Sequence, residues 1–384
     1  MRLIGVICLI GLQAIAAVWT TDKTWNEQLE SQYSQWVEVN WTNDVFTNPQ
    51  SPLYGLKTDC ADASYAMRAY FAYVNRLPFT FHRFDGSRSS QAISQFDHLR
   101  ESLTRFRAFL NHVFDVTSTY TLSLDTYPIA INRQALRAGT VYVSPGIHSY
   151  QIIGVDIYGI PKTLSSTVPR ETRVLFFNHG FPFYMPGDSR RNLDGFRAFK
   201  SFDDIRASNE QFQIAASAGG DFIQYQKMMI LKLGEVDEPF ERKVKRVKSN
   251  LCFFSRERAV QVADAYVEHQ GRGGTCFGRA GFDDYSTYVR DKKLKSYFQE
   301  FKKMTAEQSW ANTPTEIKKI LLSVFLFEIP DDDCVVETSL VQKPYLRLAD
   351  INKALDEDRL VSDPNANMLQ RWGLESYAPI CPIY

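Results

Sequence analysis

Cys60 is the residue of this chain best suited to nucleophilic chemistry. It stands in the tetrapeptide Asp59-Cys60-Ala61-Asp62, and His148 follows later in the chain within a segment of strand-forming residues. A thiolate attacks carbonyl groups, and a free thiol titrates near ~8.5, so a catalytic cysteine needs a helix N-terminus and an imidazole that lower its pKa. We therefore predict that Cys60 is a nucleophile and that His148 is its general base.

The elements around these two residues would bring them together. From Cys60, apolar residues recur every three or four positions up to Leu77-Pro78, which predicts an amphipathic helix that begins at Cys60. Asp59 fits its N-cap, and the amides of the first turn would be free to stabilise a thiolate and an oxyanion. Residues 96–114 predict a second helix. Antiparallel strands are predicted over residues 117–123 and 141–155, with a turn signal at 156–159. The expected fold class is therefore α+β.

The composition and the N-terminus limit the class of protein. Lys plus Arg and Asp plus Glu both number 44, so the formal net charge is zero and no nucleic-acid partner is predicted. One Arg, an apolar run over residues 3–12 and small residues at 14–16 are typical of a secretory signal peptide, predicted over residues 1–17. This run is too short to cross a membrane, and no later stretch reaches ~18 apolar residues. The mature chain is therefore expected to be secreted or periplasmic, with no integral membrane segment.

The cysteines fit an exported protein. Of the six cysteines, Cys8 lies in the predicted leader, and an odd number in an oxidising compartment leaves one thiol unpaired. Four lie in the C-terminal part and can form two disulfides in any of three connectivities: Cys252, Cys276, Cys334 and Cys381. Cys60 would then be the free thiol, as catalysis requires.

The C-terminal part gives fewer chemical signals. Residues 195–384 have a mainly helical pattern and are predicted to form a second domain of unknown role. Their basic run at 242–248 is either a solvated helix face or a patch for an anionic cell-wall polymer. Their polar cluster at 284–291 can be assigned no chemistry.

A family resemblance rests on the cysteine segment and on the strand segment. Asp59-Cys60 opens a predicted helix that closes at Leu77-Pro78, the sequence Leu-Arg-Ala-Gly-Thr-Val-Tyr-Val stands at 136–143, and His148 is followed by alternating apolar residues. In these three features the chain resembles the NlpC/P60 cell-wall peptidases. The related CHAP amidases share this plan, and transglutaminase-like proteins resemble it more distantly. The resemblance covers roughly residues 50–170.

This resemblance implies a papain-like fold over residues 18–194, with an insertion at about 80–135. It also implies that Cys60 and His148 cleave an amide or isopeptide bond through an acyl-enzyme, with peptidoglycan peptides as the favoured substrate. The chain departs from the family pattern at two places. Ala61-Asp62 replaces the usual Ser-Gly pair after the cysteine, and Thr140 replaces the usual Asp.

The third catalytic residue must accept the other imidazole N–H of His148. Asp156 is a carboxylate on the same strand, but eight residues span about 26 Å at ~3.3 Å each, so it is expected to serve as a turn residue. The returning strand offers residues that could lie opposite the histidine: Thr163, Ser165, Ser166, Thr167 and Glu171. Tyr54 and Gln50 are candidates to support the oxyanion.

Alternatives to this site remain open. His179, beside Asn178 and after a predicted strand, is a rival base. No His, Cys or Asp group has the short paired spacing of zinc ligands, and no glycine loop suits a phosphate, so neither a metal nor a cofactor is predicted. The alternative to a cysteine hydrolase is a non-catalytic envelope binding or scaffold protein, or a transglutaminase-like acyl transferase.

Overall fold

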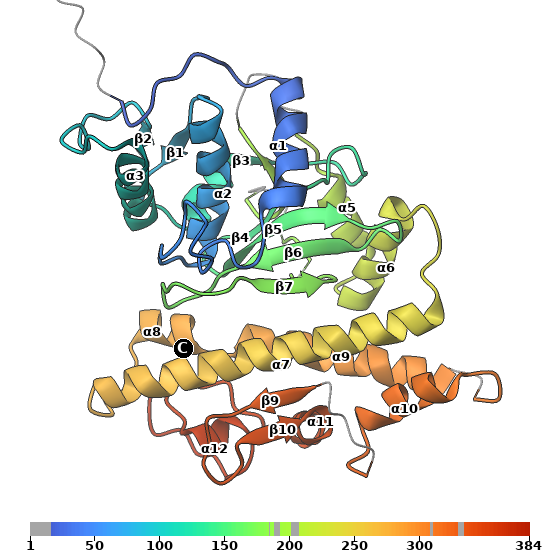
Figure 1. Ribbon diagram of the computed structural model, residues 1–384. Helices are drawn as coiled ribbons and strands as arrows, with labels where there is room; N and C mark the ends of the chain where they lie inside the picture. Colours follow the sequence, from blue (N-terminus) through green and yellow to red (C-terminus); the bar gives the residue numbers. More distant parts are fainter. Residues whose placement is uncertain (1–16, 184, 188–192, 201–206, 308–309, 329–333) are drawn as a thin grey trace, which may run out of the picture.

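The computed structural model describes residues 17–384 except residues 184, 188–192, 201–206, 308–309 and 329–333. The predicted signal peptide, residues 1–17, lies outside the described residues apart from its last one. The chain is a mixed α and β protein in two stacked parts: an N-terminal part built on a sheet, and a C-terminal part made mainly of helices (Figure 1). The α+β class is confirmed at this level.

One six-stranded antiparallel sheet organises the N-terminal part. Its strand order is β3-β8-β4-β5-β6-β7, and its strands are β3 (Thr126–Pro128), β8 (Gly195–Phe199), β4 (Val141–Ser144), β5 (His148–Val155), β6 (Pro161–Ser165) and β7 (Phe176–His179). The hairpin between β5 and β6 turns at Asp156, whose Oδ1 accepts hydrogen bonds from the amides of Tyr158 and Ile160 at 2.9 and 3.0 Å. Asp156 is thus the turn residue that the sequence predicted.

Helices α1 (Glu27–Asn40) and α2 (Cys60–Val74) contact β5. Almost every residue of α2 is buried, because small alanines let it pack between the sheet and its neighbours. Beside it lie α3 (Ser102–Val116) and the two-stranded sheet of β1 (Thr80–His82) and β2 (Arg88–Ser90). The predicted start of α2 is confirmed, whereas α3 begins later than residue 96 because Glu101 caps it.

The strand predicted over residues 117–123 is wrong. These residues enter the short helix α4 (Thr119–Leu124), in spite of their β-forming composition. The reason is local: Ser118 is its N-cap, and the Thr121 side chain accepts a hydrogen bond from the Ser118 amide at 2.9 Å. This reciprocal capping satisfies amides that would otherwise be left unpaired at a helix start.

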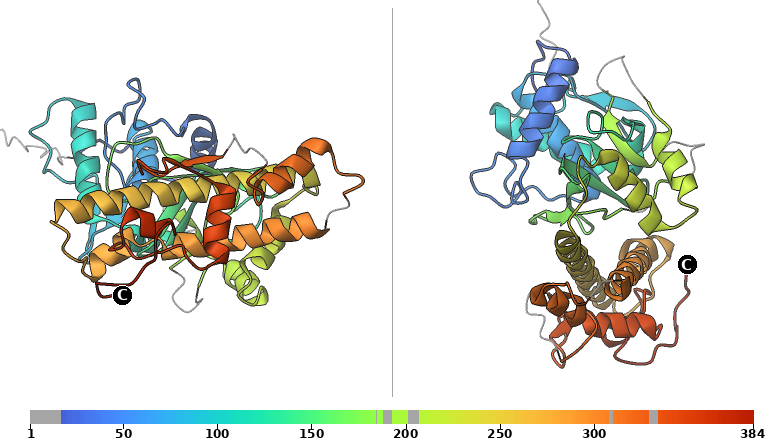
Figure 2. Two further views of the ribbon diagram at one scale, coloured as in Figure 1. Left: turned by 90° about the horizontal axis from the view of Figure 1, so that it is seen from below. Right: turned by 90° about the vertical axis from the view of Figure 1, so that its right-hand side faces the viewer.

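The C-terminal part lies against the other face of the sheet. Its elements are α5 (Glu210–Ser217), α6 (Phe222–Leu233), α7 (Phe240–Gly271), α8 (Arg279–Tyr285), α9 (Tyr288–Glu307), α10 (Thr315–Ser323), β9 (Val335–Glu337), β10 (Tyr345–Arg347), α11 (Leu348–Asp356) and α12 (Met368–Arg371). The long helices α7 and α9 pack together beneath the sheet, where Figure 2 shows them nearly end-on in its right-hand view. Tyr142 and Tyr150 of the sheet share one hydrophobic core with Phe254 and Tyr297 of these helices. Strand β8 lies inside the sheet, so the sheet continues past residue 194.

Two disulfides close the C-terminal part. Cys252 is bonded to Cys334 and Cys276 to Cys381, while Cys60 is a free, buried thiol. The predicted pair of bridges is therefore confirmed, and the structure selects one of the three connectivities. Within the described residues, no helix combines the length and the apolar character needed to cross a membrane.

Candidate active site

Cys60 is the first residue of α2, and a capping box fixes its backbone. Asp59 Oδ1 accepts hydrogen bonds from the amides of Ala61 and Asp62 at 2.9 and 3.1 Å. Asp62 Oδ2 in turn accepts from the amide of Asp59 at 3.0 Å. Sequence reasoning expected these first-turn amides to be free for a thiolate and an oxyanion, but two of them are already used by the cap.

Strand β5 is tied directly to the turn that carries Cys60. Ser149 Oγ donates a hydrogen bond to the carbonyl of Cys60 at 2.7 Å. Ser64 Oγ lies 3.1 Å from Ser149 Oγ and accepts from Gln151 Nε2 at 2.8 Å. Since Ser149 follows His148 in the chain, this buried network holds the base strand against the nucleophile helix. This network was not predicted, although Ser149 and Gln151 are polar residues in an otherwise apolar strand.

The chain that follows β6 secures the segment that precedes Cys60. Ser166 Oγ donates to the carbonyl of Thr58 at 2.8 Å, and Thr58 Oγ1 donates to Ser166 Oγ at 3.2 Å. The backbone of Glu171 pairs with Thr58 as an isolated bridge. The entry into α2 is thus held at two points by the chain that follows β6.

Cys60 and His148 line the same cavity, which has a volume of about 810 Å³. The His148 side chain is buried, and its ring lies 4.5 Å from the ring of Tyr150. His148 Nε2 has no hydrogen-bond partner among the described residues. The structure therefore brings the predicted nucleophile and base to one cavity, without a hydrogen bond between them among the contacts it describes.

The electrostatics of this pair favour the neutral forms. Burial, followed by the charges of Asp59 and Asp62, raises the pKa of the Cys60 thiol, and hydrogen bonds from the amides of Ser149 and Ala61 offset this only in part. Burial lowers the pKa of His148 well below its usual value, and the nearby cations of the C-terminal helices lower it further. The prediction that the Cys60 pKa is lowered is therefore wrong, because desolvation and two carboxylates outweigh the helix N-terminus. The resting pair is a thiol and a neutral imidazole.

The residues nominated as the third member lie in different places. Asp156 faces away from the cavity, where His179 Nε2 lies 2.8 Å from its Oδ2. Glu171 is exposed and pairs with Arg173, and Ser166 is engaged with Thr58. Ser165 is buried on β6, and its Oγ has no partner among the described residues, but it does not line the cavity.

Thr167 is the nominated residue that reaches the cavity wall. The pairing of β5 with β6 sets Gln151 opposite Leu164, and continuing this register sets His148 opposite Thr167. Its Oγ1 accepts a hydrogen bond from Arg290 at 3.3 Å. A hydroxyl partner for the imidazole is therefore better placed than any nominated carboxylate.

The remaining candidates do not join the site. Tyr54 and Gln50 are exposed, and neither lines the cavity. His179, the rival base, pairs with Asp156 away from Cys60. Within the part of the chain that the structure describes, no group of three His, Cys, Asp or Glu residues is placed to hold a metal ion.

The basic run at 242–248 is held by ion pairs. Arg246 pairs with Glu238 at 2.8 Å, and Lys245 pairs with Glu316 at 2.9 Å. Arg242 pairs with Asp156. These contacts favour the interpretation as a charged helix surface over a patch for an anionic polymer.

The opposite wall of the cavity is built by α7 and α9. Glu257 and Gln261 come from α7, and Arg290 and Lys293 come from α9. Lys293 Nζ lies 3.2 Å from the hydroxyl of Tyr150 and also bonds the carbonyl of Pro182. Sequence reasoning noted Arg290 without a role and missed the other three, because only the tertiary fold places these helices over Cys60.

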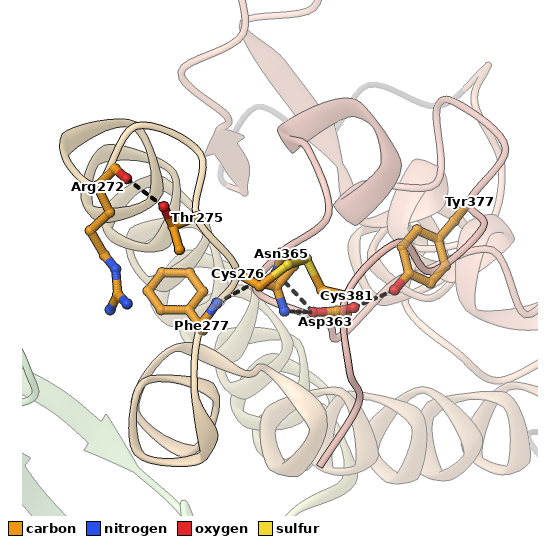
Figure 3. Close-up of a disulfide and its surroundings, with 8 residues drawn as sticks. All are labelled: Arg272, Thr275, Cys276, Phe277, Asp363, Asn365, Tyr377 and Cys381. Atoms are coloured by element: carbon orange, nitrogen blue, oxygen red, sulfur yellow. Dashed lines mark hydrogen bonds between the residues drawn. A yellow bond between two sulfur atoms is a disulfide. The ribbon is translucent and has the colours of Figure 1, made fainter.

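The C-terminal segment closes one side of the cavity. Tyr377 donates a hydrogen bond to Asp363, and the Cys276–Cys381 disulfide fixes the segment to the chain that precedes α8 (Figure 3). Asn365 Oδ1 also accepts from the amide of Phe277 at 2.8 Å. Tyr377 and Asp363 both line the cavity.

Comparison with known proteins identifies no relative of this chain. No family model matches the chain, and neither a curated protein nor a solved structure is significantly similar to it. The class that the fold and the site define is an α+β protein with a helix-borne free cysteine beside a strand-borne histidine.

Proposed function

We propose that this protein is a secreted or periplasmic cysteine hydrolase of papain-like fold that cleaves amide or peptide bonds. The observation that carries the proposal is the meeting of the unpaired Cys60 with the unpartnered Nε2 of His148 on one cavity. The two disulfides suit an oxidising compartment. Peptidoglycan stem peptides are the favoured substrates because of the resemblance to cell-wall peptidases.

The neutral resting pair determines the order of proton transfers. His148 accepts the thiol proton while the sulfur of Cys60 attacks the substrate carbonyl carbon, so the base acts during the attack. The resulting imidazolium then donates that proton to the leaving amine as the C–N bond breaks, which leaves a thioester on Cys60. Water, deprotonated by His148, attacks the thioester and releases a carboxylic acid and the free thiol.

Product analysis on purified peptidoglycan fragments tests this proposal. The mature chain is incubated with the fragments at pH 7 to 8, and new amine and carboxyl ends are identified by mass spectrometry. Cleavage is expected to fall by at least about 10³-fold in Cys60→Ala and at least about 10²-fold in His148→Ala. His179→Ala is the matched control, since this histidine lies off the cavity, and it should cleave at the rate of the unsubstituted chain.

Other outcomes assign the chain to another class. Cleavage that survives in Cys60→Ala rules out the acyl-enzyme. A product joined to an added amine, with little free acid, supports acyl transfer of the transglutaminase type. An intact substrate under all conditions favours the non-catalytic envelope protein.

A further inference from the structure

Two residues of α7 that line the cavity each carry a buried oxygen atom for which the described part of the chain offers no hydrogen-bond donor. Glu257 and Gln261 are each only 5% exposed, and they lie one helical turn apart on the same face of α7. Glu257 Oε1 and Gln261 Oε1 both lack a hydrogen-bond partner among the described residues. A buried acceptor without a donor is destabilising, so a ligand that donates a hydrogen bond to both oxygens would be stabilised at this place.

The charges around the cavity favour a cation. Asp and Glu residues outnumber Lys and Arg residues on its wall: Asp59, Glu257, Asp283, Asp284, Asp358 and Asp363 face Arg290 and Lys293. The cations of α9 offset the burial of Glu257 only in part: Arg290 and Lys293 lower the pKa of its carboxyl, but burial keeps that pKa raised. The hydrogen bonds of these two cations go to Thr167, Tyr150 and Pro182. Charge and unpaired acceptors thus point to the same kind of ligand.

The pair lies close to the proposed nucleophile. Glu257 and Gln261 line the same cavity as Cys60, and Tyr150 lines it with them. A group bound to α7 would therefore belong to the same small substrate whose carbonyl reaches Cys60. A cavity of about 810 Å³ is large enough for a short peptide.

We propose that Glu257 and Gln261 form a subsite for a primary ammonium group of the substrate. Glu257 Oε1 and Gln261 Oε1 each accept one of its N–H groups, and the carboxylate of Glu257 supplies the charge complement. The inference rests on the proposed function, and it restricts the substrates of this protein to peptides that carry a free amine near the scissile bond.

Binding to the Cys60→Ala variant separates this inference from catalysis. The two ligands are the stem tetrapeptide L-Ala-γ-D-Glu-meso-diaminopimelyl-D-Ala with free amines and the same peptide with both amines acetylated. Calorimetric titration of the mature variant chain should give a Kd for the free peptide at least about tenfold lower than for the acetylated peptide. Adding Glu257→Gln, which preserves shape, should remove most of that preference. Glu268→Gln, an exposed position on the same helix, should retain it.

The outcomes bear on the two proposals separately. Equal affinity for the two peptides, no binding of the free peptide, or an unchanged preference in a folded Glu257→Gln variant overturns the ammonium subsite, whatever Cys60 does. The comparison of the two peptides needs no change at Glu257, so it holds even where that variant fails to fold. Amine-dependent binding without any cleavage by the unsubstituted chain keeps the subsite and overturns the hydrolase.

Discussion

Removing the charge of Asp59 should speed the reaction of Cys60 with an alkylating reagent. Asp59 is the largest electrostatic cause of the raised thiol pKa after burial. For a charge separation of about 6 Å, the interaction is roughly 1.4–2.8 kcal/mol at an effective dielectric constant of about 20–40. This corresponds to about one to two pKa units. Asp59→Asn should therefore raise the alkylation rate about 10- to 100-fold at any pH below the thiol pKa.

The assay is the rate of iodoacetamide incorporation at Cys60, followed by mass spectrometry between pH 6.5 and 9.5. The ratio of variant to unsubstituted rates reports the charge, because burial slows the reagent equally in both proteins. Asn is as good an N-cap as Asp, so α2 should still begin at Cys60. Glu101→Gln is the matched control: Glu101 caps α3, where its carboxylate accepts from the amide of Leu103 at 2.8 Å, and it does not line the cavity.

Equal alkylation rates in Asp59→Asn and in the unsubstituted chain, with unchanged circular dichroism, would refute the electrostatic reasoning. The same holds for a thiol that already reacts as a thiolate near pH 7, because the resting pair would then be an ion pair. A rate increase in Glu101→Gln would show that the effect is not local to the cap.

Two further predictions concern stability. Burial lowers the pKa of Lys293 to about 7, so between pH 7 and 10 the folded state binds fewer protons than the unfolded state. The free energy of unfolding should therefore rise with pH by up to about 1.4 kcal/mol per pH unit. Urea unfolding at pH 7.5, 8.5 and 9.5 should show this slope in the unsubstituted chain and a flatter one in Lys293→Met, and parallel slopes would contradict the prediction. The Cys276–Cys381 bridge closes a sequence separation of 105 residues. Its replacement by two serines should therefore lower the free energy of unfolding by about 5 kcal/mol on chain-entropy grounds. A loss below about 1 kcal/mol in urea titrations would show that the chain without the bridge keeps the segment in place.

Local signals account for the parts of the fold that the sequence predicted. The start of α2 depends on Asp59 and on the periodicity that follows, and both lie within a few residues. The β5–β6 turn likewise depends on Asp156 and on Gly159, which has a positive φ. The strand prediction for residues 117–123 was wrong because their composition favours strands, whereas the capping residue Ser118 starts a helix there. Propensity is a weak guide where a cap competes with it.

The candidate site was predictable only on its N-terminal side. Cys60 could be found because it stands at a recognisable helix start, and His148 because it lies in a segment of strand-forming residues. Thr167 could be found because strand pairing has a fixed register. Glu257, Arg290 and Lys293 come from two helices that only packing brings over the cavity. The predicted lowering of the Cys60 pKa was wrong for the same reason, because burial beneath the C-terminal part is a tertiary effect.

The two proposals are linked by one electrostatic argument. Burial and the carboxylates of Asp59 and Asp62 oppose a thiolate at Cys60, so the free protein holds its nucleophile as a thiol. A substrate ammonium bound at Glu257 would neutralise part of that negative field and lower the pKa of the thiol, since a nearby positive charge favours the ionised form. A peptide with its amine acetylated would fit the same space without this effect. The free amine would then select the substrate and also activate the residue that attacks it.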